Sequence, residues 1–344
     1  MSTVLDLLRA PEFADDRLTE SINIPPYETG RLAQLGLFTD TPLHTTYAKI
    51  GIEEGTITII PARERGGPGN KNMGGDRRET LIPIPHFPLD DAITPSDLQN
   101  LTVYGSNYVM QALGNVYNDK LQAMRSKHDA THANLDWGAI NGLVIDAENK
   151  TLFNLWSHFG VTQPTMSFAL STEATDVAAK NRALKQAIRR NLKGAPSSGV
   201  RVFAGADWFD AYVGHASVKE GLKRYRGDTP DPGRDDITDE FRYAGLVVER
   251  VEEEFDVRLA DNTFETRPAV AANQAVAVPF GTPYFRRYIA PPDTIQDANR
   301  APRPSDKVFV STDDLPHGKG RDMHTESNVL PVCLRPQVMF KLTL

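Results

Sequence analysis

The sequence predicts an α+β fold, and three observations lead to this prediction. Residues 45–87 are predicted to form an extended hairpin arm and residues 106–136 one long helix. A strand over 200–203 with short helices around Trp208 and from Ser217 predicts a compact unit that mixes helices and strands. The chain has 344 residues, of which 40% are hydrophobic, so two domains with a sizeable core are expected.

Composition narrows the class of protein. No run of about 18 apolar residues occurs, and the first residues lack the basic start and apolar core of a signal peptide, so we expect a protein that is made and used in the cytoplasm or leaves it by a route other than secretion. The lone Cys333 excludes an internal disulfide framework and a zinc ribbon. A net charge of -7 disfavours a dedicated nucleic-acid binder, so any contact with nucleic acid should be local.

The hairpin arm has strand-like ends and an unusual middle. Residues 45–52 and 56–60 are rich in β-branched side chains, whereas residues 63–78 are dense in glycine and arginine and have almost nothing to bury. Residues 81–86 are predicted to return as an edge strand, with prolines at alternate positions. An arm of this kind suits a protein that grips its neighbours.

The first half of the chain contains an arm and a long helix. Residues 1–44 are predicted to be extended because Pro25 and Pro26 interrupt regular structure. Thr94, followed by proline and then Asp97, marks a helix start, with a break or bend near Gly105. From residue 106 the apolar side chains recur every three or four positions, which predicts a helix roughly 45 Å long.

The second half predicts a hairpin, several short helices and further strands. Its expected elements are a hairpin over 143–146 and 151–156, a helix over 175–193 closed by Gly194, a strand over 200–203, a helix around Trp208, a helix from Ser217 with Glu220 completing a capping box, an exposed acidic insert over 227–240, strands over 245–251, 275–278 and 285–289, an irregular stretch over 291–304, and strands over 329–334 and 337–342.

Three residues on the long helix resemble a metal site. His128, His132 and Asp136 are spaced by four, so they can share one helix face. The metalloprotease pattern needs Glu after the first His, but Asp129 stands there. The favoured interpretation is a polar helix end whose histidines cap or pair with neighbouring subunits. Since no serine elbow or phosphate loop occurs either, we expect no enzyme activity.

Charged residues elsewhere have plain explanations. The arginines of the arm alternate with Glu64, Asp76 and Glu79, and mixed charge suits a protein surface better than a nucleic-acid backbone. Residues 252–254, all glutamate, are expected to be a solvated edge, and the Arg-Gly-Asp tripeptide at 226–228 is expected by chance.

The order of elements and several short segments resemble a known family. These segments are PYETGRLAQLGLF at 26–38, PARERGGPG at 61–69, KHDAT at 127–131, FGVTQP at 159–164 and HTESN at 324–328. Together they resemble the lambda-type (E family) major capsid protein of tailed bacteriophages over nearly the whole chain.

The resemblance implies the Hong Kong 97-type capsid fold. Its parts would be an N-terminal arm (1–45), an extended loop (46–87), a peripheral domain with the spine helix (88–165), an axial domain (166–322) and a C-terminal strand of the peripheral domain (323–344). The stretch 293–310 fits the family pattern least well, so the axial-to-peripheral boundary stays open over 293–322.

The resemblance also implies a function. The chain would self-assemble into hexamers and pentamers of an icosahedral head, which encloses double-stranded DNA contacted non-specifically on its inner face. Expected partners are a separate scaffolding protein and protease, a portal and an optional decoration protein, with no membrane, metal or cofactor. The shell would assemble in the host cytoplasm and become the virion capsid. Candidate contacts between subunits are Arg63, Arg65, Lys71, Arg77, Arg78, Tyr27 and Arg31.

Two alternatives remain at this point. An encapsulin-like cellular nanocompartment of the same fold would hold enzyme cargo in place of a genome. A metal-dependent hydrolase would use His128, His132 and Asp136. Because both arms are expected to bury little within their own subunit, we also expect stability to come largely from assembly.

Overall fold

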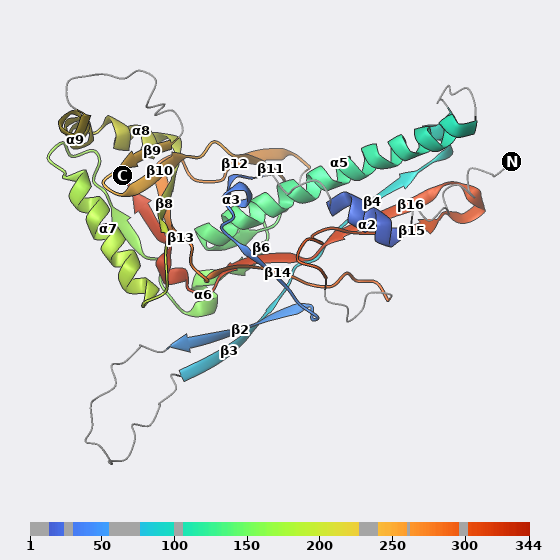
Figure 1. Ribbon diagram of the computed structural model, residues 1–344, viewed down its shortest axis with the longest axis horizontal. Coiled ribbons are helices and arrows are strands. Elements are labelled where there is room, and N and C mark those ends of the chain that lie inside the picture. Colours follow the sequence, from blue (N-terminus) through green and yellow to red (C-terminus); the bar gives the residue numbers. More distant parts are fainter. Residues whose placement is uncertain are drawn as a thin grey trace, which may run out of the picture. The chain divides into compact units, whose positions relative to one another are not determined.

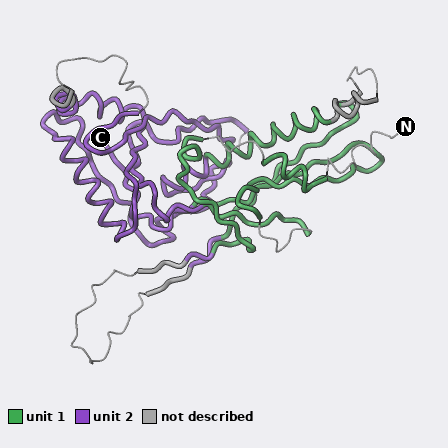
Figure 2. Tube along the Cα trace, viewed as in Figure 1, with its two compact units in different colours: residues 1–48, 83–133, 287–331 green, residues 49–82, 134–286, 332–344 purple. Residues whose placement is uncertain are grey.

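The computed structural model describes residues 14–23, 30–54, 76–99, 106–226, 240–259, 262–295 and 302–344. The chain divides into two compact units, drawn in different colours in Figure 2. Unit 1 comprises residues 1–48, 83–133 and 287–331, and unit 2 comprises 49–82, 134–286 and 332–344. Both mix helices with strands, so the predicted α+β class is confirmed.

The elements carry the labels of Figure 1. The helices are α2 (Asp15–Asn23), α3 (Arg31–Gln34), α4 (Pro95–Gln99), α5 (Ser106–Asn141), α6 (Leu155–Phe159), α7 (Val177–Leu192), α8 (Ala206–Gly214) and α9 (Ala216–Arg226), with 3-10 turns η2 (Pro316–Gly318) and η3 (Pro336–Val338). The strands are β1 (Thr39–Pro42), β2 (Tyr47–Glu54), β3 (Asp76–Pro83), β4 (Phe87–Ile93), β5 (Leu143–Ile145), β6 (Thr151–Asn154), β7 (Thr165–Ser167), β8 (Gly199–Ala204), β9 (Glu240–Tyr243), β10 (Leu246–Arg250), β11 (Glu254–Arg258), β12 (Phe264–Pro268), β13 (Gln274–Phe280), β14 (Phe285–Ile289), β15 (Phe309–Asp314), β16 (Arg321–Ser327), β17 (Val329–Cys333) and β18 (Phe340–Thr343).

Unit 1 is built on an antiparallel sheet in the order β15-β16-β4, with α2 against β15. Its central strand β16 pairs with both neighbours over its whole length. A buried apolar cluster joins α2, α5 and this sheet through Leu18, Ile22, Ile93, Tyr117, Leu121, Val308, Val310 and Met323. These contacts hold the first part of the long helix on one face of the sheet (Figure 1).

The N-terminal region differs from the extended arm that we predicted. Residues 15–23 form α2, which begins with Asp15 and Asp16, and acidic residues stabilise a helix N-terminus. Pro25 and Pro26 follow the end of this helix and so do not interrupt it. Because Leu18 and Ile22 are buried in unit 1, the expectation that the arm buries little in its own subunit is wrong here.

The long helix and its approach follow the prediction closely. Thr94 donates from its amide and its hydroxyl to Asp97 Oδ2, at 2.9 and 3.0 Å, which is the expected cap of α4. Helix α5 begins at Ser106 as expected and continues to Asn141, beyond the expected end at residue 136. Gly142, with φ +81°, ends it in the left-handed region.

Unit 2 centres on a six-stranded sheet in the order β7-β18-β13-β8-β10-β9. Helix α8 packs on β10 and β13, and α7 contacts α9 (Figure 1). Trp208 stacks on Tyr212 at 5.1 Å between ring centroids and meets Phe168 edge-on at 5.4 Å. Aromatic pairs of this kind add to the free energy gained from their burial.

Several predicted elements of unit 2 are confirmed and others shift. The β5–β6 hairpin is present, but the predicted strand through residue 156 stops at Asn154, which caps α6. The predicted capping box of Ser217 and Glu220 is wrong, because Ser217 lies inside α9 and its hydroxyl accepts the amide of Val177. Residues 252–254 are more than a solvated edge, since Glu253 accepts a hydrogen bond from the Trp137 indole.

Near the C-terminus, β17 agrees with the strand predicted over 329–334. The second predicted strand, over 337–342, begins later, because η3 occupies residues 336–338 and β18 starts at Phe340.

No helix in the described ranges is long and apolar enough to cross a membrane.

The second strand of the hairpin arm begins earlier than predicted, at Asp76 in place of residue 81. β2 and β3 form a two-stranded sheet, closed at its base by a hydrogen bond from Ile84 N to Thr46 O at 3.0 Å. The strand predicted over 56–60 and most of the glycine-rich tip lie outside the described residues. Arg77 and Arg78 belong to β3, so the glycine- and arginine-rich stretch predicted over 63–78 ends inside a paired strand. The acidic insert predicted over 227–240 also falls outside, apart from residue 240.

Candidate functional site

The seven predicted contact residues are not gathered into one place by the structure. Arg31 begins α3, and its Nη1 atom lies 3.5 Å from Gln34 Oε1. Arg77 and Arg78 lie in strand β3. Four further candidates lie outside the described residues, namely Tyr27, Arg63, Arg65 and Lys71. Their role in contacts between subunits stays a prediction.

His128 and His132 hold α5 against β16. His128 Nε2 lies 3.0 Å from Thr325 Oγ1, and His132 Nε2 lies 2.6 Å from Ser327 Oγ. All four side chains are buried, and we call them the polar seam. The expectation that these histidines contact neighbouring subunits is therefore wrong, because their partners lie within the same chain.

The hydrogen-bond network fixes the tautomer of both histidines. Thr325 donates its hydroxyl proton to Leu89 O at 3.1 Å, and Ser327 donates its own to Lys307 O at 2.7 Å. Each hydroxyl can then only accept from the imidazole, so both rings carry their proton on Nε2. The Nε2 atoms are thus used to pack the helix on the sheet.

The polar seam matches the repeats of its two elements. Four residues of an α-helix rise about 6 Å, and two residues of an antiparallel strand rise about 6.8 Å. The spacing from His128 to His132 therefore equals the spacing from Thr325 to Ser327 within about 1 Å. A shift of β16 by one residue would turn both hydroxyls away from the helix. The seam therefore sets which residues of β16 face α5.

Both histidines are kept neutral by their surroundings. Burial lowers the pKa of His128 to about 4, with a smaller contribution from the Arg125 charge. Burial also lowers the pKa of His132 well below its usual value, helped by the charge of Arg287. No three His, Cys, Asp or Glu side chains in the described part of the chain are placed to hold a metal ion, and Asp136 is itself buried.

Two ion-pair networks surround the seam in unit 1. Arg125 Nε donates to Asp129 Oδ1 at 2.7 Å, and its Nη1 donates to the carbonyl of Ile22, which ties α5 to the end of α2. Asp40 accepts from Arg287 at 3.0 Å and from Lys307 at 3.1 Å. Sequence reasoning missed the second network because its members are far apart in the chain.

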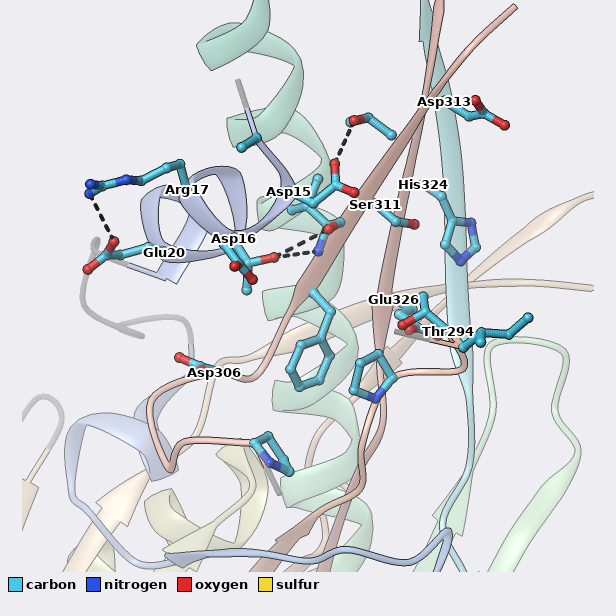
Figure 3. A pocket seen from close by; sticks show the side chains of 18 of the residues that line it. Asp15, Asp16, Arg17, Glu20, Thr294, Asp306, Ser311, Asp313, His324 and Glu326 are labelled. Atoms are coloured by element: carbon cyan, nitrogen blue, oxygen red, sulfur yellow. Dashed lines mark hydrogen bonds and ion pairs between the residues drawn. The ribbon is translucent and has the colours of Figure 1, made fainter. Parts of the chain in front are cut away.

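A polar groove of about 1020 Å³ lies beside the sheet of unit 1 (Figure 3). Its walls come from α2, from residues 292–295 and 302–306, and from β15 and β16. Seven of the lining residues are acidic, against two arginines and one histidine; the acidic ones are Asp15, Asp16, Glu20, Asp306, Asp313, Asp322 and Glu326. We call this the acidic groove.

Glu326 is the most deeply buried acid of the groove, with its side chain 2% exposed. Its Oε1 accepts the amide of Asp293 at 2.8 Å, and its Oε2 lies 3.4 Å from His86 Nδ1 without a hydrogen bond. Burial raises the pKa of this carboxyl, and the Asp293 amide works against that rise. The groove therefore combines surface carboxylates with one buried carboxylate, an arrangement that favours a cationic partner.

The sequence contained a signal for this groove that we did not use. In β16 the residues Asp322, His324 and Glu326 alternate with Met323 and Thr325, which is the period of a strand with one polar face. The buried positions of the strand include polar residues such as Thr325, so the alternation of apolar and polar residues is hard to recognise in the sequence.

Comparison with known proteins gives three findings. The sequence profile of the family described as phage major capsid protein E matches residues 16–344. The major capsid protein of Pseudomonas phage KPP10 is 26% identical over 350 aligned residues, covering 96% of each chain. That of Salmonella phage Felix O1 (isolate Felix O1-VT1) is 22% identical and covers 94% of each chain.

Among solved structures, the putative capsid protein of a prophage of E. coli CFT073 has a similar fold. The TM-score is 0.54 at 13% sequence identity, with 96% of this chain and 99% of that chain covered. At this identity the likeness concerns the fold alone. The expected capsid fold is confirmed by these comparisons.

Proposed function

Since the chain belongs to the phage major capsid protein E family and is a shell protein of a phage head, we propose that its role is structural, without catalysis, and that it forms the hexamers and pentamers of an icosahedral shell around double-stranded DNA. The observation that carries this proposal is the family match, which runs from residue 16 to the last residue. The nanocompartment alternative is not favoured, because both curated relatives are phage proteins.

The interior chemistry supports a structural role. In the described residues, the buried histidines and carboxylates that could serve catalysis are committed to other side chains or to backbone groups. His128 and His132 bind hydroxyls, Asp129 binds Arg125, and Asp40 binds two cations. These contacts fix how the elements of unit 1 pack.

Several partners are part of the proposal. A separate scaffolding protein and protease would guide assembly in the host cytoplasm, a portal would occupy one vertex, and a decoration protein would bind outside. Contact with packaged DNA would be local and non-specific, because the net charge of -7 offers no extended basic surface. We also propose an N-terminal arm (1–45), an extended loop (46–87), a peripheral domain with the spine helix (88–165, with 323–344) and an axial domain (166–322). The last two bounds do not follow the two units, because β15 pairs with β16 in unit 1 and β18 lies in the sheet of unit 2.

The proposed contacts between subunits are Tyr27 and Arg31 near the N-terminus and the basic residues of the hairpin arm, Arg63, Arg65, Lys71, Arg77 and Arg78. Each exposed ion pair stabilises an interface by under about 1 kcal/mol. Because the same contact recurs at every subunit of a closed shell, these small terms add up.

Particle composition tests the proposed function. Particles would be purified from a host that produces the phage and treated with nuclease. We expect this chain to account for most of the protein, in sealed particles whose DNA survives digestion. Particles that hold a packaged enzyme and no protected DNA would contradict the proposal in favour of a nanocompartment.

A further inference from the structure

One helix of unit 2 carries charges of a single sign. Helix α7 and the residue that follows it, 177–193, contain lysine and arginine but no aspartate or glutamate, although the whole chain has a net charge of -7. The basic residues are Lys180, Arg182, Lys185, Arg189, Arg190 and Lys193. The hairpin arm differs, because acids alternate there with the arginines. The charge of α7 therefore needs an explanation of its own.

The helix, which runs along the margin of unit 2 (Figure 1), buries one face and turns most of its charge away from it. Its buried residues are Val177, Asn181, Leu184, Ile188 and Leu192. Four cations follow one another at spacings of three or four residues, and we call them the basic stripe: Arg182, Lys185, Arg189 and Lys193. Lys185 is half-buried and the other three are exposed. At about 1.5 Å per residue the stripe is about 17 Å long.

Contacts within the subunit use little of this charge. Arg182 Nη2 lies 3.7 Å from Asp176 Oδ2, and both side chains are 63% exposed, a setting in which an ion pair adds little stability. In the part of the chain that the structure describes, Lys185, Arg189 and Lys193 form no ion pair. The stripe is thus free to bind another molecule.

The helix dipole explains only one end of the stripe. Cations in the last turn stabilise the C-terminal end of a helix, which accounts for Arg189 and Arg190. This effect fades within one turn of the helix end, so it does not account for Arg182 and Lys185. Folding of the subunit therefore leaves the length of the stripe unexplained.

A row of cations without acids fits a polyanion better than a protein surface, where both signs are usually mixed. One strand of B-DNA carries a phosphate about every 3.4 Å along the helix axis, so about five phosphates lie within the length of the stripe. Four cations on one helix face can contact these phosphates without reading the bases. The chemistry of the stripe is thus that of a non-specific DNA contact.

We propose that the basic stripe of α7 is the surface through which each subunit contacts the packaged double-stranded DNA. The inference deepens the proposed function and rests on it, because a shell that encloses DNA brings this polymer to its inner face. It requires that the outward side of α7 face the interior of the shell.

The salt dependence of DNA binding tests the stripe in the unassembled full-length chain. Fluorescence anisotropy would follow a labelled duplex of about 20 base pairs between about 50 and 200 mM NaCl. Each contacted phosphate adds about -0.9 to the slope of the logarithm of the binding constant against the logarithm of salt concentration. Four contacts therefore predict a slope of about -3.6 and a loss of affinity of about a hundredfold over this range. A duplex of unrelated sequence should give the same slope.

Neutralising two arginines of the stripe should make this slope less steep by about 1.8. The variant is Arg182→Gln with Arg189→Gln, and circular dichroism checks that it folds. Arg182→Lys with Arg189→Lys keeps both charges and should bind like the unmodified chain. The matched control, Lys127→Gln with Lys150→Gln, removes two exposed cations outside α7 and should leave the slope unchanged. Equal slopes for the stripe variant and this control would overturn the inference.

Labelling of one cysteine tests which way the stripe faces. Gln186→Cys places a thiol on the exposed side of α7, between Lys185 and Arg189. We expect a small maleimide to label it in empty shells and to react more slowly when DNA fills them. A maleimide on a polymer too large to enter should label only the unassembled chain. The native Cys333 stays unlabelled, because it is buried and burial raises its pKa to about 12.

The outcomes separate the inference from the proposed function. Labelling of closed shells by the large reagent would place the stripe outside, and exclusion of the small reagent from empty shells would place it between subunits. Either result, or a labelling rate that DNA does not change, overturns the inference although the chain remains a shell protein. Particles of the unmodified chain that hold no DNA would instead overturn the proposed function.

Discussion

His132 Nε2 donates a hydrogen bond to Ser327 Oγ at 2.6 Å, and the Ser327 hydroxyl donates a hydrogen bond to the carbonyl of Lys307 at 2.7 Å. One helical turn earlier, His128 repeats this relation with Thr325. Two neutral imidazoles therefore act as buried donors between α5 and β16. Their neutrality is part of the packing of unit 1, which makes its stability depend on pH.

Acidification should weaken unit 1 through His128. Its pKa in the folded chain is about 4, below the usual 6.5, so the unfolded chain takes up protons more readily between these values. The contribution of neutral His128 to the free energy of unfolding is fully present above about pH 6.5. As pH falls towards 4, this contribution of roughly 3 kcal/mol is lost. Urea unfolding of dissociated subunits from pH 4 to 8, followed by circular dichroism, measures this slope. Tryptophan fluorescence would not report it directly, because Trp137, Trp156 and Trp208 all belong to unit 2.

The control for this prediction is His128→Gln. A glutamine amide can donate to Thr325 but does not titrate in this range, so the slope should flatten. Glu326 acts in the opposite direction, because its raised pKa favours proton uptake by the folded chain and adds stability as pH falls. An unchanged slope in His128→Gln would show that other groups cause the dependence.

Replacing the seam histidines by alanine should affect stability and leave metal content unchanged. We expect His128→Ala and His132→Ala each to lower the free energy of unfolding by about 1–3 kcal/mol, because each removes a buried hydrogen bond and leaves a cavity. Metal analysis of the purified chain checks the alternative. Stoichiometric zinc in the unmodified protein that both variants lose would support the hydrolase interpretation.

The Asp40–Arg287 pair gives a prediction about buried charge. Arg287 is buried, with its side chain 4% exposed, and its Nη1 lies 3.0 Å from Asp40 Oδ1. Asp40→Ala should cost about 3 kcal/mol, because it leaves a buried charge without that carboxylate. Asp40→Leu combined with Arg287→Met should recover part of the loss in denaturant unfolding, since Lys307, whose Nζ lies 3.1 Å from Asp40 Oδ2, still loses this carboxylate. Equal losses in the single and combined variants would mean that the pair does not couple.

Gly142 should not tolerate a side chain. A Cβ atom there would lie 2.1 Å from the Trp156 indole nitrogen, and φ is +81°. Gly142→Ala should therefore destabilise unit 2 by at least about 2 kcal/mol. Gly160→Ala is the control, because Gly160 has φ +63° but open space around its Cβ, so only the backbone cost of about 1 kcal/mol applies. Similar melting temperatures for the two variants would contradict this account.

The sequence predicted elements well where a local signal sufficed. The apolar repeat of α5 and the Thr94–Asp97 cap both depend on neighbours within a few residues. Strand β16 was missed because two of its inward positions, Thr325 and Ser327, are polar and are satisfied by histidines far away in the chain. Periodicity of apolar residues cannot reveal a strand whose buried face makes hydrogen bonds.

The acidic groove could not be predicted for a related reason. Its walls come from α2, from residues 292–295 and 302–306, and from β15 and β16, and only the tertiary fold brings these segments together. Residues 15–23 were also expected to be extended, although the prolines at 25 and 26 only mark where α2 has already ended. By contrast, the family resemblance identified the shell fold because it depends on segments spread along the whole chain.

Electron microscopy of the purified full chain tests the central claim most directly. The protein would be assembled alone and together with a scaffolding protein, and the particles imaged and reconstructed. We expect closed icosahedral shells built of hexamers and pentamers, with the two units of this fold in every subunit. Only monomers or small open oligomers in both preparations, from a chain that circular dichroism shows to be folded, would contradict the account.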